Sequence, residues 1–135
     1  MSDELYQEAL LKLAKEAPRK GRLEPNDASA RLDNPLCGDR VRIDLRLKDG
    51  RIADLAQEVR GCVLCQAAGG IIGRHAVGLD RQGVAGLCGE VDRVLAGENP
   101  AVAELEAFRP VARHRSRHDC VRLPFQALKE AVDVK

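Results

Sequence analysis

The chain has 135 residues, a length that predicts one domain with its own hydrophobic core. Apolar residues make up 44% and charged residues 32%, which excludes wholesale disorder. The 22 basic and 21 acidic residues leave a net charge of +1, and aromatic residues make up only 2%, so the composition disfavours nucleic-acid binding and an anionic membrane surface. The N-terminus lacks the apolar core of a secretory signal, and no apolar run could span a bilayer, so we expect a cytoplasmic protein.

The cysteine content is the unusual feature of the composition. The cysteines are odd in number, and without an export signal structural disulfides are not expected. Metal binding or thiol chemistry is therefore the leading hypothesis for their role. Their positions are Cys37, Cys62, Cys65, Cys88 and Cys120.

The N-terminal third of the chain is expected to hold a helix, a loop and the start of a sheet. Apolar residues at helical spacing predict an amphipathic helix from residue 3 to about 17, which Pro18 ends. The polar, proline-containing residues 18–35 predict an extended loop. Alternating apolar and charged residues predict a strand over 40–48, with its apolar face covered and its charged face open.

A tight hairpin is expected to follow this strand. Asp49-Gly50 is a strong signal for a two-residue turn, so a second strand is expected over about 51–60. A one-residue bulge in the hairpin would bring Leu45 opposite Leu55, which is the better alignment. The pair of strands predicts a small antiparallel sheet.

Helices are expected to make up most of the second half. One begins near Cys62, and another runs over about 81–96. A short helix at 101–108 and a solvated basic stretch at 109–118 come before a last helix. The apolar stripe on 81–96 predicts that Cys88 is a packed core thiol. This stripe consists of Val84, Leu87, Cys88, Val91 and Leu95.

Two residues of metal-ligand type stand just before the first strand. Cys37 and Asp39 are two positions apart, so their side chains point the same way in an extended chain. A regular hairpin would place Cys37 opposite Cys62, and a bulged hairpin would place it opposite Val63. Either register brings Cys37, Asp39 and Cys62 together at one end of the sheet, where they could share a metal ion.

Cys62 stands at an expected strand-to-helix junction, where the helix N-terminus favours thiolate over thiol. Two cysteines and a carboxylate give three ligands of a tetrahedral soft-metal site, and the candidates for the fourth are Cys65, Cys120 and His118. A second interpretation of Cys62-x-x-Cys65 is a redox dithiol, as in the thioredoxin arrangement. Because a hairpin rather than a βαβ unit comes before this pair, we favour the metal site.

The basic stretch 109–118 admits two interpretations. It is either a solvated loop or a docking surface for an acidic partner that also holds positive charge beside Cys120. We expect Cys120 to follow it on a mobile loop, with Pro124 in the first turn of the last helix. The basic residues of the stretch are Arg109, Arg113, His114, Arg115, Arg117 and His118.

Three ordered signatures lie along the chain. The first is the string Asn34-Pro35-Leu36-Cys37-Gly38-Asp39, and the second is Gly61-Cys62 after the hairpin. The third is Cys120, followed by Leu123, Phe125 and Leu128 in the last helix. Together these signatures resemble the NifU-like scaffold family of iron–sulfur cluster assembly, and the resemblance covers most of the chain, from about residue 5 to 131. Carried over position by position, it implies a site made by Cys37, Asp39, Cys62 and Cys120.

Two features make the chain look more like the SufU branch of this family than the IscU branch. Asp119 stands where the IscU branch has a histidine before the third cysteine, and the Leu-Pro-Pro-Val-Lys segment of that branch is absent. Cys62 and Cys120 are 58 residues apart, farther than in the IscU branch. The resemblance implies zinc bound by the Asp and three Cys, and sulfur accepted from a cysteine desulfurase. Cys65 is an extra thiol where the family usually has a serine-rich segment.

The fold expected from these features is α+β, with a small antiparallel sheet and helices packed on one face, in one NifU-like domain over 1–135. The predicted function is an iron–sulfur cluster assembly scaffold, most simply non-enzymatic, that binds zinc, iron or transiently a [2Fe-2S] cluster. Cys120 is the predicted sulfur acceptor, as a persulfide, and Asp39 is the predicted exchangeable ligand.

The expected partners are a cysteine desulfurase of the SufS or IscS type and downstream iron–sulfur carriers or apo-proteins, without nucleic acid or membrane. One alternative is a zinc-dependent sulfurtransferase that relays sulfur and never holds a cluster. A second, from another class, is a structural zinc protein that serves only as an interaction module.

Overall fold

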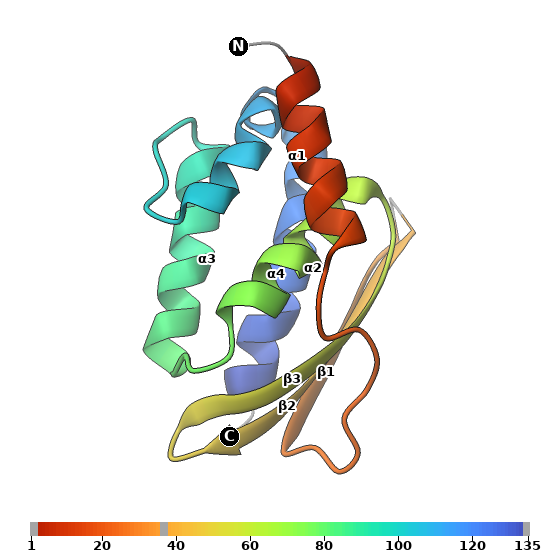
Figure 1. Cartoon of the computed structure of the whole chain (residues 1–135), viewed down its shortest axis with the longest axis vertical. Coiled ribbons are helices and arrows are strands. Elements are labelled where there is room, and N and C mark those ends of the chain that lie inside the picture. The colour runs from red at the N-terminus through yellow and green to blue at the C-terminus, as the bar shows by residue number, and fades with distance from the viewer. Residues whose placement is uncertain (1–2, 36–37, 134–135) are drawn as a thin grey trace.

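The computed structural model describes residues 3–35 and 38–133 of the chain. It shows a three-stranded antiparallel sheet with helices packed against one face, which confirms the predicted α+β class (Figure 1). In chain order the elements are α1 (Asp3–Lys15), β1 (Ala28–Asn34), β2 (Asp39–Lys48), β3 (Arg51–Arg60), α2 (Val63–His75), α3 (Arg81–Leu95), the 3₁₀ helices η1 (Ala103–Arg113) and η2 (Arg115–Arg117), and α4 (His118–Asp133). Within the described ranges, no helix combines the length and apolarity needed to cross a bilayer.

The β2–β3 hairpin turns where the sequence predicts. Asp49 and Gly50 have φ angles of 54° and 78°, the left-handed pair that a two-residue hairpin turn needs. The register shifts by one residue just beyond the turn, so that Leu45 pairs with Leu55. The bulged alternative is therefore the correct register, because it places the apolar residues of both strands on one face.

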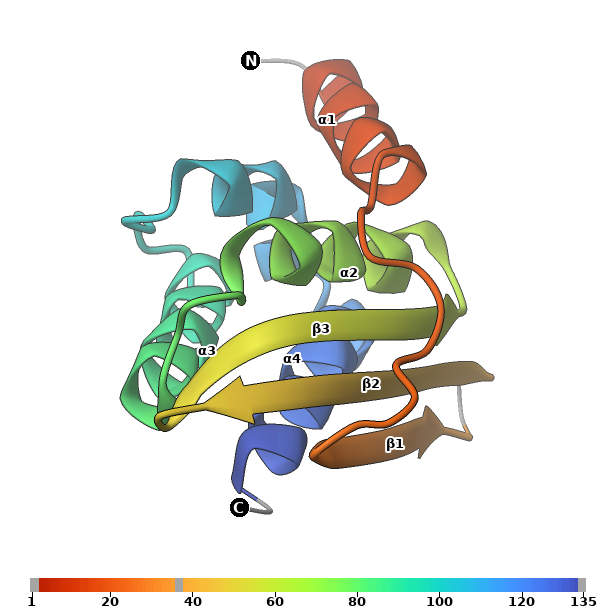
Figure 2. The ribbon, with the colours of Figure 1, turned by 60° about the horizontal axis from the view of Figure 1, so that its bottom comes forward.

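The inner face of the sheet forms the core with two helices. Val41, Ile43 and Leu45 of β2 have no exposed surface. Helix α4 contacts β1 and β2, and α2 contacts β3. Helix α1 packs on α2, and α3 packs on α4, so the helices cover one face of the sheet in depth (Figure 2). This arrangement brings the N-termini of α2 and α4 to the same end of the sheet as the start of β2 (Figure 1).

The outer face of the sheet is crossed by the segment between α1 and β1 (Figure 2). The Leu23 amide donates to Asp44 Oδ2 at 3.1 Å, and Arg46 Nε donates to the Pro25 carbonyl at 3.0 Å. Asp44, on the outer face, is only 1% exposed as a result. The segment covers the middle of this face and leaves open the end of the sheet at which β2 begins (Figure 2).

The prediction of an uninterrupted loop over 18–35 is wrong, because β1 occupies Ala28–Asn34 within it. The inward positions of β1 are Ala28, Ala30 and Leu32, which pair with apolar residues of β2. Alanine has a low strand propensity, so the alternation is weak in the sequence. Pairing with β2 supplies the stability that local preference lacks.

The stretch 109–118 is largely 3₁₀-helical rather than a loop, although residues 113–117 are exposed, as expected of a solvated stretch. The 3₁₀ helix η1 extends to Arg113 and buries Phe108 and Val111, and η2 links it to α4. The residues of η2 are all at the surface. The last helix starts at His118, so Pro124 lies in its second turn rather than in its first.

Candidate metal centre

Three side chains of metal-ligand type converge at the end of the sheet. Asp39 is the first residue of β2, Cys62 caps the N-terminus of α2, and Cys120 lies in the first turn of α4. Their ligand atoms all lie within 4.8 Å of one another. Two sulfurs and a carboxylate at this spacing suit a borderline-soft cation such as zinc or ferrous iron.

The Asp39 carboxylate is buried, and only one of its two oxygens accepts a hydrogen bond from the described residues. Asp39 is only 2% exposed, and its Oδ1 accepts a hydrogen bond from the Cys62 amide at 3.1 Å. Oδ2 is buried and has no hydrogen-bond partner within the described part of the chain. An unsatisfied buried carboxylate oxygen is costly, and a cation is a suitable partner for it. The unpartnered Oδ2 therefore indicates that a cation would fit within this group.

Gly61 allows the close approach of Asp39 to the α2 cap. A Cβ atom at Gly61 would lie 2.2 Å from Asp39 Oδ1, well inside any real contact distance. The requirement for glycine here is thus steric and depends on the neighbouring carboxylate. It explains physically why a glycine comes directly before Cys62.

Both cysteines of the group sit at the start of a helix. Cys62 has extended backbone angles at the N-cap of α2 and makes no side-chain capping bond, so its sulfur is not used to cap the helix. Cys120 follows His118 and Asp119 in the first turn of α4. The positive end of a helix dipole favours negative charge, so both positions suit a thiolate that binds metal or attacks sulfur.

The group is largely enclosed but borders on an open hollow. Cys120 is fully buried and Cys62 is half-buried. A hollow of about 420 Å³ reaches Asp39 from the outer side of the sheet. Its lining residues are Asp33, Asn34, Pro35, Gly38, Asp39, Arg40 and Arg60.

Of the three residues that the sequence offered as a further ligand, only Cys120 lies in the group. Cys120 joins the group, whereas Cys65 is fully buried in the hydrophobic core and is not a member. His118 Nε2 lies 3.0 and 3.2 Å from the carbonyls of Val111 and Ala112, so it is engaged with η1 instead. Cys37 lies outside the described residues, and its place in the site stays a prediction.

The mobile loop expected around Cys120 is wrong. Cys120 is 0% exposed inside α4 and packs in the core cluster. Cys120 lies one helical turn before the buried Leu123 and Pro124, and the acidic Asp119 suits the first turn of a helix. The sequence signal that could have shown this is Cys120 itself, which falls on the buried stripe one turn before Pro124.

Cys88 is half-buried and packs against the core, rather than lying within it as its stripe predicts. Its Sγ donates to the Phe125 carbonyl at 3.6 Å and thereby links α3 to α4. Burial raises the pKa of the Cys88 thiol to about 11, so it remains protonated at neutral pH. A protonated, half-buried thiol is poorly suited to accept sulfur.

Comparison with known proteins gives a consistent family signal. The model of the family "NifU-like N terminal domain" matches residues 5–133. Over 131 residues the chain is 27% identical to the iron–sulfur cluster assembly scaffold protein IscU of Thermotoga maritima, covering 95% of this chain and 92% of the relative. Over 135 residues it is 25% identical to the zinc-dependent sulfurtransferase SufU of Bacillus subtilis, covering 96% and 90%. The crystal structure of a NifU-like protein (N-terminal) from Brucella abortus matches with a TM-score of 0.88 and 30% identity, covering 97% and 94%.

Proposed function

Because the chain belongs to the NifU-like N-terminal domain family, we propose that it is a scaffold of iron–sulfur cluster assembly that accepts sulfur from a cysteine desulfurase. The observation that carries the proposal is the group of Asp39, Cys62 and Cys120, with Asp39 Oδ2 buried and unpartnered. The names of an IscU scaffold and a SufU sulfurtransferase among its relatives support it. The proposed setting is the cytoplasm, and the proposed partners are a desulfurase and downstream carriers or apo-proteins.

The ligand set of the proposed site is Asp39, Cys62, Cys120 and Cys37. The first three are brought together by the fold, and Cys37 is added from the sequence resemblance. Zinc, when bound there, would hold the sulfurs as thiolates and keep them ready for reaction. An iron–sulfur cluster is cargo of the scaffold, built on the same sulfur ligands.

Sulfur acceptance at Cys120 is a sulfur-transfer step without net oxidation. The Cys120 thiolate attacks the outer sulfur of a persulfide on the desulfurase, and a new S–S bond forms at Cys120 Sγ. The S–S bond of the donor breaks, and its cysteine leaves as a thiolate that takes up a proton. The transferred sulfur keeps its oxidation state, so no added oxidant or reductant is needed.

The start of α4 offers a way to expose Cys120. Pro124 stands four residues after Cys120 and has no N–H to donate to the Cys120 carbonyl, so this helical bond cannot form. The preceding η2 helix has no buried residue. The first turn of α4 therefore has one hydrogen bond fewer than a regular helix, and the η2 segment before it is not packed in the core. Such a turn can open at a low cost in free energy. Cys62, which is half-buried without any opening, is the competing acceptor.

Anaerobic reconstitution with iron, cysteine and a purified desulfurase tests the proposed function. A scaffold develops visible absorbance from a bound cluster, and Cys37→Ser or Cys62→Ser abolishes both this absorbance and stoichiometric metal. Cys88→Ser is the matched control and should behave like the unchanged protein.

Other outcomes contradict the scaffold proposal in distinct ways. Zinc by elemental analysis and a persulfide by mass spectrometry, with no visible absorbance, indicate the zinc-dependent sulfurtransferase. Stoichiometric zinc with no persulfide at any cysteine indicates a structural zinc module.

A further inference from the structure

An arginine-lined hollow lies on the open end of the outer sheet face. Its volume is about 130 Å³, and its walls come from all three strands and the segment before β1. Five arginines and one acid line it, and we refer to it as the arginine hollow. These residues are Arg22, Arg31, Arg40, Arg42, Arg60 and Glu58.

The strand register places like charges directly opposite each other in the arginine hollow. Arg31 of β1 pairs with Arg42 of β2, and Arg40 of β2 pairs with Arg60 of β3. Like charges at directly opposed positions destabilise an antiparallel sheet. Two such pairs in adjacent rows are an unfavourable arrangement for the fold itself, and a bound anionic group would relieve it.

The acids around the arginine hollow only partly balance its charge. Asp33 pairs with Arg40 at 2.7 Å, and Glu58 pairs with Arg22 at 2.8 Å. The buried Asp44 pairs with Arg42 at 3.0 Å from the covered part of the sheet. Glu24 also acts on Arg22, so five guanidinium groups face four carboxylates and the arginine hollow keeps an excess of positive charge.

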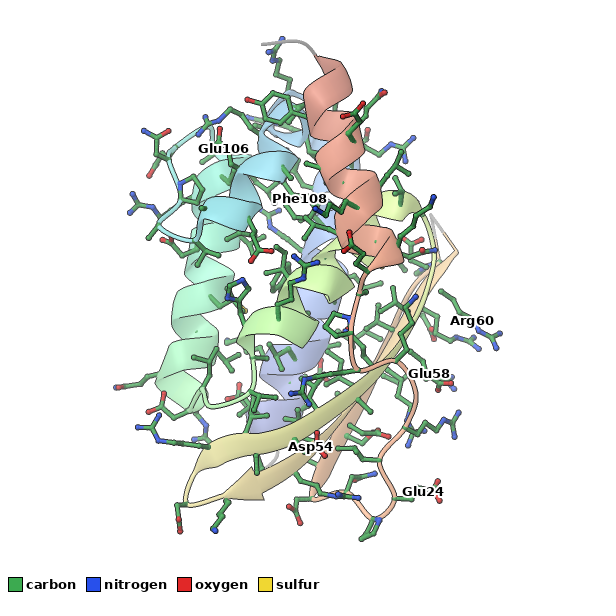
Figure 3. The ribbon with its side chains drawn as sticks, in the orientation of Figure 1. Glu24, Asp54, Glu58, Arg60, Glu106 and Phe108 are labelled. Carbon is green, nitrogen blue, oxygen red and sulfur yellow. The ribbon has the colours of Figure 1, made fainter. Side chains whose placement is uncertain are left out.

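Arg60 has the clearest unused binding capacity. Across the described residues it forms no ion pair, and its side chain points away from the helices (Figure 3). Its opposite neighbour Arg40 is 52% exposed and shares only the Asp33 carboxylate, which also lies 3.9 Å from Arg31. The planar guanidinium group pairs with a carboxylate through two parallel hydrogen bonds, so these side chains suit carboxylate recognition.

The arginine hollow adjoins the larger hollow that reaches Asp39. Arg40 and Arg60 line both it and the larger hollow that reaches Asp39. Arg40 directly follows Asp39 in β2, and Arg60 comes two residues before Cys62. A protein segment held in the arginine hollow would therefore lie at the end of the sheet that carries Asp39 and Cys62.

We propose that the arginine hollow docks an acidic segment of the sulfur-donating partner, with two carboxylate side chains paired to Arg40 and Arg60. The proposal rests on the sulfur-acceptor function for the identity of the partner and on the strand register for the site. Charge complementarity favours an anionic segment, and the near-neutral net charge and low aromatic content of the chain favour carboxylates of a protein over nucleic acid. Docking here would hold the donor persulfide near Cys62 and the start of α4.

An eight-residue glutamate peptide labelled with fluorescein tests the docking chemistry directly. Titration by fluorescence anisotropy should show binding that weakens as salt is raised, and a glutamine peptide of the same length should not bind. The double variant Arg40→Gln and Arg60→Gln should lose about tenfold in affinity. The control Arg93→Gln and Arg122→Gln removes the same charge from α3 and α4 and should retain the affinity.

Two results would overturn the proposal. One is unchanged peptide affinity in the Arg40→Gln and Arg60→Gln variant, with the loss appearing instead in Arg113→Gln and Arg115→Gln near η2. The other is tighter binding of a single-stranded oligonucleotide of eight nucleotides, lost in the same Arg40 and Arg60 variant, which would identify nucleic acid as the occupant.

The same variants separate this proposal from the proposed function. Peptide binding needs neither metal nor sulfur, so a chain that binds the peptide but never accepts sulfur disproves only the proposed function. With a purified desulfurase, the Arg40→Gln and Arg60→Gln variant should form the complex about tenfold more weakly at unchanged metal content. Its thermal unfolding temperature should change little, because relief of the like-charge pair offsets loss of the exposed Arg40–Asp33 ion pair.

Discussion

Asp39 Oδ1 accepts a hydrogen bond from the backbone amide of Cys62 at 3.1 Å, while the other oxygen of the same carboxylate is buried without a partner. This hydrogen bond links Asp39, the first residue of β2, to the N-cap residue of α2, which is 23 positions later in the chain. This bond fixes the carboxylate beside the Cys62 sulfur and leaves Oδ2 for a cation.

Asp39→Ala should retain the metal and change its exchange. A carboxylate is a harder ligand than a thiolate and fits a soft cation less well, so it is the ligand that leaves most easily. Zinc content by elemental analysis should stay near that of the unchanged protein, whereas the rate of zinc loss to a chelator and the rate of sulfur transfer should change. Asp39→Asn is the control, because its side-chain carbonyl can still accept the hydrogen bond from the Cys62 amide. Identical rates in all three proteins would contradict the exchangeable role.

Gly61→Ala should disrupt the site because its Cβ would meet Asp39 Oδ1. We expect a loss of about 1–3 kcal/mol in the free energy of unfolding, together with weaker zinc binding. Gly86→Ala is the matched control, since no atom lies within 4 Å of that Cβ position in α3. There the change should stabilise the helix by about 0.5–1 kcal/mol. Urea unfolding and a zinc titration measure both effects, and a Gly61→Ala protein with full zinc affinity would argue against the steric account.

Asp44 should make stability depend on pH in the acid range. Burial raises its pKa, but hydrogen bonds from Ser29, from the Leu23 amide and from Arg42 outweigh this and lower the pKa overall. A carboxyl whose pKa is lower in the folded state stabilises the fold above its unfolded pKa of about 3.9, and this contribution is lost as the pH falls below that value. Asp44→Asn should therefore cost about 1–3 kcal/mol at pH 7 and much less at pH 3. Urea unfolding at the two pH values gives the comparison, and an equal cost at both would exclude the ionised carboxylate as the cause.

Cys88→Ala should leave sulfur chemistry intact and reduce stability modestly. The change removes a hydrogen bond to the Phe125 carbonyl and some packing between α3 and α4, on the order of 1 kcal/mol. In the unchanged protein, Cys88 should react with iodoacetamide more slowly than an ordinary thiol at pH 8, because burial raises its pKa to about 11. Loss of sulfur acceptance in a folded Cys88→Ala protein would show that the thiol has a further role.

The sheet and its register could be predicted because local signals and the core pattern agree there. Alternation in β2, the Asp49-Gly50 turn and the alignment of Leu45 with Leu55 all require the same hairpin. That register carries Asp39 to Cys62 without any long-range information. Strand β1 could not be predicted, since its inward alanines have little strand preference and depend on β2 for pairing.

The position of Cys120 is a long-range property that periodicity alone does not fix. Its membership of the site follows from α4 crossing β1 and β2 so that its first turn meets the start of α2. The basic stretch before it suggested a solvated loop, but η1 continues into that stretch as far as Arg113 and buries Val111 against the core. The role of Gly61 likewise depends on a side chain 22 residues away, and only the packed structure shows the contact.

Pro124→Ala should tighten the first turn of α4 and slow sulfur acceptance at Cys120. The new N–H can donate to the Cys120 carbonyl, which completes the helical bond that proline prevents. Hydrogen exchange at Arg122 and Leu123, whose N–H groups lie where they donate to the carbonyls of the first turn, should slow, because the turn opens less often. If opening exposes Cys120 to the donor, the rate of persulfide formation there should fall in step with the exchange rate, while zinc content stays the same.

Gln126→Ala is the control for this change, since it raises helix propensity at an exposed position of α4 without adding a bond near Cys120. Incubation with a desulfurase and cysteine, followed by mass spectrometry, locates the persulfide in each protein. Slower exchange with an unchanged rate at Cys120 would show that opening of the turn does not limit transfer. Persulfide on Cys62 with Cys120 unmodified would instead assign acceptance to the half-buried thiol at the α2 cap, which needs no opening of α4.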